Sequence, residues 1–133
     1  MIIFGYKEHI LYAEYIGWAI SIFLNFTVQE KIIYFICVGV GLILPDVDRA
    51  DSMVGHNVKY FSSWLNKTVG HRTLTHSLFF ITVLYYSANI AFGMNVVSTG
   101  LMIGCTMHIL FDLMTPMGVS LIYPINNKLY KIK

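Results

Sequence analysis

The sequence predicts an all-α protein, a multi-span transmembrane helical bundle with about four spans. Its 133 residues are 56% hydrophobic and only 12% charged, whereas soluble domains are about half apolar and about a quarter charged. The mean hydropathy is +0.64. The apolar residues gather in four segments separated by turns and one long loop. A chain of this length forms one domain, which we assign to residues 1–133.

The apolar segments have lengths typical of helices. They cover residues 9–28, 31–44, 74–92 and 96–114. A spanning helix needs about 20 residues to cross about 30 Å of hydrocarbon, and the first, third and fourth segments are long enough. The second either extends back through Val28 or crosses a thinned bilayer, and a buried helix of a soluble bundle is the alternative. Gly39 and Gly41 in this segment would allow a neighbouring helix to approach closely.

The long loop between the second and third segments, residues 45–71, is expected to carry a short helix. Its apolar residues at helical spacing are Val58, Phe61, Trp64 and Leu65, with lysines on both flanks. This pattern indicates an amphipathic helix in the membrane interface, and an ordinary surface helix packed on the bundle is the alternative.

Basic residues lie almost entirely on one side of the predicted bundle. With four spans, both termini and the long loop share that side. It holds Lys7, Arg49, Lys59, Lys67, Arg72, Lys128, Lys131 and Lys133, and the other side holds only Lys31. By the positive-inside rule, we expect a multi-pass membrane protein with both termini in the cytoplasm.

Composition also narrows the choice of partner. The net charge is only +2, and the basic residues are not interleaved with stacking aromatics, so direct nucleic-acid binding is not expected. Cys37 and Cys105 are isolated in apolar runs, which is typical of small buried residues and not of a disulfide framework. The expected partner is the lipid bilayer.

Histidines and carboxylates at the edges of the apolar segments are the candidate functional residues, because burying such groups without partners costs several kcal/mol. His108 and Asp112 are four residues apart and share a helix face. They could bind one metal ion, or Asp112 could orient His108. A plain hydrogen bond between them is the alternative.

Two further motifs precede the third segment. Asp46 and Asp48 follow Pro45, and paired carboxylates resist ionisation unless a cation or an arginine lies between them. Capping or a solvated turn is the alternative. His71 is expected at the end of the loop and His76 in the first turn of the third helix, which Thr73 or Thr75 would cap.

Arg72, between these histidines, suits a phosphate or carboxylate through its planar fork. Its alternative roles are a salt bridge to Asp46 or Asp48, or a contact with a lipid headgroup.

Together these groups predict a metal centre at one membrane face. The candidate ligands are His9, Asp46, Asp48, His71, His76, His108 and Asp112. Mixed imidazole and carboxylate ligands suit zinc, our first choice, or manganese or iron, and the absence of thiolates argues against a closed structural zinc site. The candidates outnumber the ligands of one ion, so one or two ions are expected. His56 is not included in the site. Glu14, one turn deeper than His9, either supports the ligands from outside or extends towards the membrane interface.

These motifs resemble those of a known family. The matching elements are His9, the Leu44-Pro45-Asp46-Val47-Asp48 run, His71 to Ser77, Gly104 to His108 with Asp112, and Gly118 to Pro124. They resemble the YdjM-like family of inner-membrane, metal-dependent hydrolases, also described as LexA-binding. The resemblance implies a multi-span helical membrane protein with hydrolase activity, and a LexA-like repressor as a protein partner.

The expected function is therefore that of a membrane-bound, metal-dependent hydrolase. Its location favours a phosphoester or other ester of an amphiphilic substrate at the cytoplasmic face. Arg72 and Asp48 are the candidate catalytic residues: Arg72 would steady the negative charge of the substrate, and Asp48 is among the groups that supply ligands or a general base. The alternatives are a non-enzymatic, metal-stabilised scaffold or regulatory partner and, ranked last, ion or proton transport.

Overall fold

The protein is built from helices, as the sequence predicts. The computed structural model describes residues 6–93 and 95–132, with side chains from residue 10 onward. The helices are α1 (Tyr6–Ser21), α2 (Val28–Ile43), η1 (Pro45–Asp48), α3 (Met53–Asn57), α4 (Lys59–Val69), α5 (Leu78–Phe92) and α6 (Asn95–Leu113). Within the described residues, β-structure is limited to one isolated antiparallel bridge, between Val119 and Tyr130.

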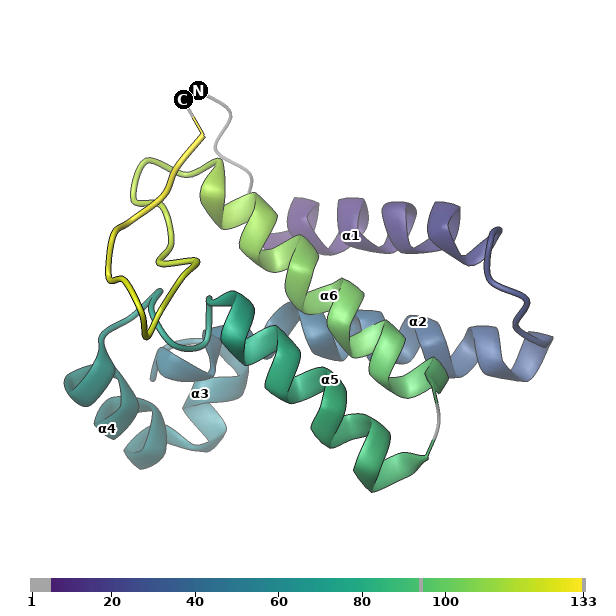
Figure 1. Ribbon diagram of the computed structural model, residues 1–133, viewed down its shortest axis with the longest axis horizontal. Coiled ribbons are helices and arrows are strands. Elements are labelled where there is room, and N and C mark those ends of the chain that lie inside the picture. The colour runs from purple at the N-terminus through teal and green to yellow at the C-terminus, as the bar shows by residue number, and fades with distance from the viewer. Residues whose placement is uncertain (1–5, 94, 133) are drawn as a thin grey trace.

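The four long helices form a bundle in which successive members run in opposite directions (Figure 1). Helix α6 packs against α1, α2 and α5, and most extensively against α2. The end of α2, the beginning of α5 and the end of α6 lie at one end of the bundle, together with α3, α4 and the C-terminal segment of residues 114–132 (Figure 1). The candidate motifs of the sequence therefore meet at this end.

Helix α2 begins earlier than its apolar run, as one of the two sequence alternatives requires. Thr27 and Glu30 form a capping box, in which the Glu30 amide donates to Thr27 Oγ1 at 3.3 Å and the Thr27 amide donates to Glu30 Oε2 at 2.8 Å. These bonds satisfy two backbone donors at the helix start. The second apolar segment thus extends back to Val28.

Two helical stretches are long and apolar enough to cross a membrane, judged by length and composition. They are Val28–Asp48, with 21 residues, and Asn95–Leu113, with 19 residues. Helices α1 and α5 have 16 and 15 residues, which at the helical rise is only about 22–24 Å. The expected count of four spans remains a prediction.

The segment expected to be a long loop is mostly helical. It contains η1, α3 and α4, and α4 matches the short helix predicted there. Ser52 organises the turn between η1 and α3: its hydroxyl donates to the Asp46 carbonyl at 2.6 Å and accepts from the Gly55 amide at 2.9 Å. Because side chains satisfy these backbone groups, the segment folds onto the bundle end.

Helices α2 and α6 contact each other closely through their backbones. A Cβ atom added to Gly41 would lie 2.4 Å from the Leu101 carbonyl oxygen, and one added to Gly104 would lie 2.1 Å from the Val38 carbonyl oxygen. The close approach expected from Gly41 is confirmed. Small residues let helices come this near, which maximises van der Waals contact.

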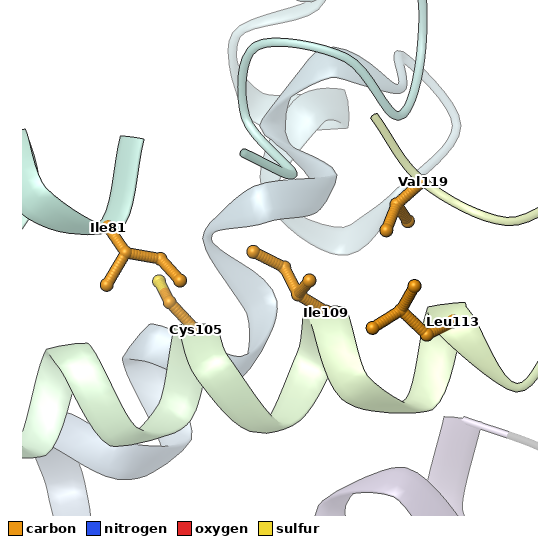
Figure 2. Close-up of a cluster of buried hydrophobic side chains, with 5 residues drawn as sticks. All are labelled: Ile81, Cys105, Ile109, Leu113 and Val119. Carbon is orange, nitrogen blue, oxygen red and sulfur yellow. The ribbon is translucent and has the colours of Figure 1, made fainter. Parts of the chain in front are cut away.

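Two apolar clusters flank this contact. One contains Tyr34, Val38, Val96 and Ile103. The other contains Ile81, Cys105, Ile109, Leu113 and Val119, in which α6 residues face α5 and the C-terminal segment (Figure 2). Cys105 is fully buried there, as its apolar context predicts.

Replacing Gly104 with valine is expected to destabilise the protein by at least about 2 kcal/mol. The new side chain would overlap the backbone of α2, and relieving the overlap would require two packed helices to move apart. Thermal unfolding of detergent-purified protein measures the change. The matched control is Ala91→Val on the exposed face of α5, which should change stability by less than about 0.5 kcal/mol. Equal effects of the two substitutions would contradict the backbone contact.

Candidate metal centre

Three elements bring the candidate residues together at the bundle end. Asp46 and Asp48 lie on η1, which Pro45 begins. The loop of residues 70–77 supplies His71 and His76 ahead of α5. The last turns of α6 supply His108 and Asp112.

Ser77 caps α5, because its hydroxyl accepts from the Phe80 amide at 3.2 Å. The prediction that Thr73 or Thr75 caps this helix is therefore wrong. The hydroxyl of Thr75 is instead available to the buried polar cluster.

Four acceptor atoms converge in the centre of the site. His76 Nε2 lies 3.2 Å from His108 Nε2 and 3.2 Å from Asp112 Oδ2. His108 Nε2 also lies 3.6 Å from Asp112 Oδ2 and 3.8 Å from Asp46 Oδ1. His76 is fully buried, and Asp46 is the most exposed of the four, at 22% of its side chain. We call this set the central cluster.

The neighbours of the two imidazoles define where their protons lie. His108 Nδ1 is 2.6 Å from the Leu42 carbonyl oxygen, which can only accept, so Nδ1 carries the proton. Thr75 Oγ1 donates its one proton to Asp48 Oδ2 at 2.8 Å and therefore accepts from His76 Nδ1 at 2.9 Å. In the neutral imidazoles both Nε2 atoms are left with lone pairs that face each other.

Burial disfavours the charged form of His76. Desolvation lowers the pKa of its imidazole below the ordinary value, and this outweighs the opposing effect of the neighbouring Asp112 and Asp48 carboxylates. Two imidazole nitrogens and two carboxylate oxygens therefore lie close together, an arrangement that a shared proton or a bound cation would stabilise.

The spacing of the central cluster suits a small divalent ion. Ligands at about 2.0–2.1 Å from a tetrahedral ion are separated from one another by about 3.3 Å, and four of the six separations in the central cluster range from 3.2 to 3.8 Å. The ligand atoms of Asp46, His76 and His108 all lie within 4.8 Å of one another. These three residues therefore fit such an ion, and Asp112 lies beside the two imidazoles.

A second group, Asp48 with His71 and His76, also has metal-ligand spacing. Its acceptors, however, already have donors. Asp48 Oδ1 lies 2.7 Å from His71 Nδ1, and Oδ2 accepts from the Thr75 hydroxyl at 2.8 Å and the Arg72 amide at 3.2 Å. The Asp48 carboxylate is 1% exposed, so these donors compensate for its burial. The arrangement orients His71 and His76 through hydrogen bonds.

Arg72 connects the loop to the carboxylates of Asp48 and Asp112. It is the one described residue other than glycine with a positive φ, at 63°. Its Nη2 donates to Asp112 Oδ1 at 2.8 Å and its Nη1 to Thr115 Oγ1 at 2.7 Å. Its carbonyl accepts from the Ser120 amide at 3.0 Å. This left-handed conformation costs about 1–3 kcal/mol and persists only where surrounding contacts impose it.

The guanidinium of Arg72 thus pairs with Asp112 and not with Asp46 or Asp48, the two partners considered from the sequence. The reason is geometric: the left-handed backbone turns the amide of Arg72 towards Asp48, while its side chain lies against the end of α6. Pairing Oδ1 of Asp112 with Arg72 leaves Oδ2 facing the imidazoles.

His9 and His56 are the histidines not yet placed. His9 lies on α1, and its side chain is outside the described residues. His56 lies on α3 and is exposed, as expected from its exclusion. Thr75, Thr115 and the Leu42 carbonyl oxygen were not expected as partners. Thr75 lies inside the motif His71–Ser77, which could have suggested a role for it. A backbone carbonyl on another helix leaves no signal in the sequence.

Comparison with known proteins identifies the family. The chain matches the model of the YdjM inner membrane protein family over residues 5–133. It is 33% identical over 85 residues to the uncharacterized protein YvsG of Bacillus subtilis (strain 168), covering 64% of this chain and 53% of that one. It is also 33% identical over 87 residues to the inner membrane protein YdjM of Escherichia coli (strain K12), covering 62% of this chain and 44% of that one.

The inner membrane protein YdjM of Shigella flexneri matches to the same extent. The chain spans about half the length of these curated relatives, and no solved structure matches it significantly. The polar motifs that form the site fall inside the region matched by the family model, and this chain belongs to the YdjM inner membrane protein family.

Proposed function

We propose that this protein is a membrane-bound, metal-dependent hydrolase of the cytoplasmic membrane face, acting on a phosphoester or other ester of an amphiphilic substrate. The observation that carries the proposal is the convergence of the Asp46 carboxylate and the imidazoles of His76 and His108, with the Asp112 carboxylate beside both imidazoles. Their preference for a shared cation supports a bound divalent ion, with zinc as the first choice and manganese or iron as alternatives.

The central cluster supplies the ligands in this proposal: Asp46, His76, His108 and Asp112. We assign Asp48 and His71 to the surrounding network, because donors within the protein already occupy the Asp48 carboxylate. Partners of this kind orient ligands and raise their affinity for the metal. This favours one ion over two. His9, on the same bundle end by sequence, is an additional candidate ligand.

The bound ion would contribute to hydrolysis by polarising the substrate. A divalent ion bound by the central cluster would act as a Lewis acid towards a phosphoryl or acyl oxygen. Arg72 would hold Asp112 in place through Nη2. Its buried Nε has no hydrogen-bond partner among the described residues, and a negatively charged substrate oxygen would satisfy it, in keeping with the role expected for this residue.

The expected contact of the bundle with lipid favours an amphiphilic substrate. Apolar side chains on α1, α2 and α5 are exposed, including Tyr15, Ile36 and Ile90, which favours lipid contact along the bundle. The exposed aromatic side chains of α4, Tyr60, Phe61 and Trp64, support its proposed place in the interface, beside the metal centre and on the cytoplasmic side.

A second candidate is a metal-stabilised scaffold or regulatory partner without turnover. The depth of the site favours it: His76 is fully buried and the side chain of His108 is 9% exposed, so access runs mainly past Asp46. Structural metal sites are closed, whereas catalytic sites keep an open position.

Loss of the central imidazoles is expected to abolish metal binding. Elemental analysis of detergent-purified protein should give about one equivalent for the wild type and less than about a tenth for His76→Ala or His108→Ala, since removing one ligand of a four-ligand site removes most of its affinity. His56→Ala is the matched control and should retain the full content. Equal metal content in all four proteins would contradict the site.

His71→Ala tests the number of ions. If His71 acts through Asp48, metal affinity should fall about 10–100-fold while the protein still reaches one equivalent at saturation, measured by titration of the chelator-stripped protein. Two equivalents in the wild type that fall to one in His71→Ala would instead show that Asp48, His71 and His76 form an ion site of their own.

Hydrolysis tests the function itself. Purified protein in mixed micelles should release phosphate or acid from at least one long-chain phosphomonoester or carboxylic ester. We expect kcat/KM to fall at least about 100-fold in His108→Ala, the size of effect typical of losing one electrostatic element of an active site. His56→Ala should remain active. Bound metal without turnover on any of these esters would favour the scaffold.

A further inference from the structure

The outward side of α4 is aromatic and basic, and the account above gives it no ligand. Tyr60 is 94% exposed, and Phe61 and Trp64 are 51% and 59% exposed. The ring centroids of Phe61 and Trp64 lie 6.0 Å apart. Lys67 is exposed and follows Tyr60 by seven residues, and positions i, i+4 and i+7 share one side of a helix. We call these four residues, with Lys59 at their edge, the α4 face.

Contacts on the opposite side of α4 hold the α4 face outward. The hydroxyl of the fully buried Ser62 donates to the Gly55 carbonyl at 3.1 Å. The side-chain amide of Asn66 donates to the Asp48 carbonyl at 3.1 Å, and Leu65 is buried beside these two residues. Helix α4 therefore buries a serine while its aromatic side chains point away from the bundle. Exposed apolar patches of this kind mark interaction surfaces.

The bond from Asn66 also sets the level of α4 relative to the bilayer. Asp48 is the last residue of Val28–Asp48, one of the two stretches that are long and apolar enough to cross a membrane, and the chain belongs to an inner membrane protein family. The end of a spanning stretch lies near the lipid headgroups, so this bond holds α4 at headgroup level. Tryptophan and tyrosine are enriched at that level.

The charge of the α4 face favours an anionic partner. Residues 52–111 contain no aspartate or glutamate, and Asp51 pairs with Arg49 at 2.8 Å. The ion pairs of the described residues include neither Lys59 nor Lys67. A second copy of the α4 face would bring the same positive charges, and like charges across an interface repel. The cytoplasmic side of a bilayer, in contrast, carries anionic headgroups that attract lysines.

We propose that the α4 face binds anionic phospholipid headgroups, with its lysines beside the phosphates and its aromatic side chains at the boundary with the acyl chains. The inference extends the interfacial placement of α4 proposed above to a lipid class, and it does not require hydrolysis. A zwitterionic headgroup carries its own ammonium group and offers the lysines no net charge. Because Asp48 also accepts from His71 and Arg72, the bound lipid would gather beside the loop of the metal centre.

Quenching by brominated lipids tests the lipid class. Trp18→Phe leaves Trp64 as the one tryptophan, and single copies of the protein are placed in nanodiscs of phosphatidylcholine and phosphatidylglycerol, with one or the other lipid brominated. At equal mole fractions, we expect brominated phosphatidylglycerol to quench Trp64 more strongly. The apparent preference should be at least about fivefold, the effect of one lysine beside an anionic surface.

Replacing both lysines, Lys59→Gln with Lys67→Gln, should remove this preference. Lys31→Gln is the matched control, because Lys31 lies in the first turn of α2 at the other end of the bundle, and it should leave the preference unchanged. Thermal unfolding verifies that each variant is folded. Equal quenching by the two lipids before the lysines are replaced, or an equal loss in the control and in the double variant, would overturn the proposal.

Acrylamide, a neutral quencher in water, identifies other surroundings of Trp64. If acrylamide quenches Trp64 and neither lipid does, the α4 face lies in water. If none of the three quenches it, the face is covered by protein. Both results overturn the proposal. Hydrolysis of an ester with equal quenching by the two lipids would remove the lipid site and leave the hydrolase, whereas a preference for phosphatidylglycerol without turnover would leave the lipid site and remove the hydrolase.

Discussion

The backbone contact between α2 and α6 is the constraint on which the metal centre depends. Gly41 and Gly104 let the two helices approach so closely that a Cβ atom at either position would overlap the backbone of the other helix. One turn beyond Gly104, His108 meets the Leu42 carbonyl at 2.6 Å. That bond assigns the proton to Nδ1 and directs the Nε2 lone pair towards the carboxylates. Helix packing therefore determines which imidazole tautomer the site presents.

The loop of residues 70–77 completes the site under strain. Arg72 adopts a left-handed backbone conformation, and three separate elements hold it: Asp48 on η1, Asp112 on α6 and Ser120 in the C-terminal segment. Each bond satisfies a group that would otherwise be buried without a partner. The C-terminal segment therefore contributes to the metal centre without supplying a ligand.

Much of this arrangement could be predicted from local patterns. Apolar runs that end at Pro45 and at the Thr115-Pro116 pair predicted α2 and α6 to within a few residues, because proline cannot continue a helical ladder. The first run, residues 9–28, was predicted too long at its end, since α1 ends at Ser21. The amphipathic spacing of residues 58–65 gave α4. Placing His71, His76, Asp46, Asp48, His108 and Asp112 at one end followed from the alternation of the helices, which needs no knowledge of contacts.

The helical architecture, its apolar character and the set of polar residues at one bundle end follow from residue spacing and composition. How that set divides into partners depends on contacts made in the folded protein. Asp48 faces donors on His71, Thr75 and Arg72, while Asp112 shares its two oxygens between Arg72 and the imidazoles. The two aspartates are chemically identical in the sequence. Asp48 and Asp112 have different partners because different elements lie near them. Their donors and acceptors can be assigned only when those distances are known.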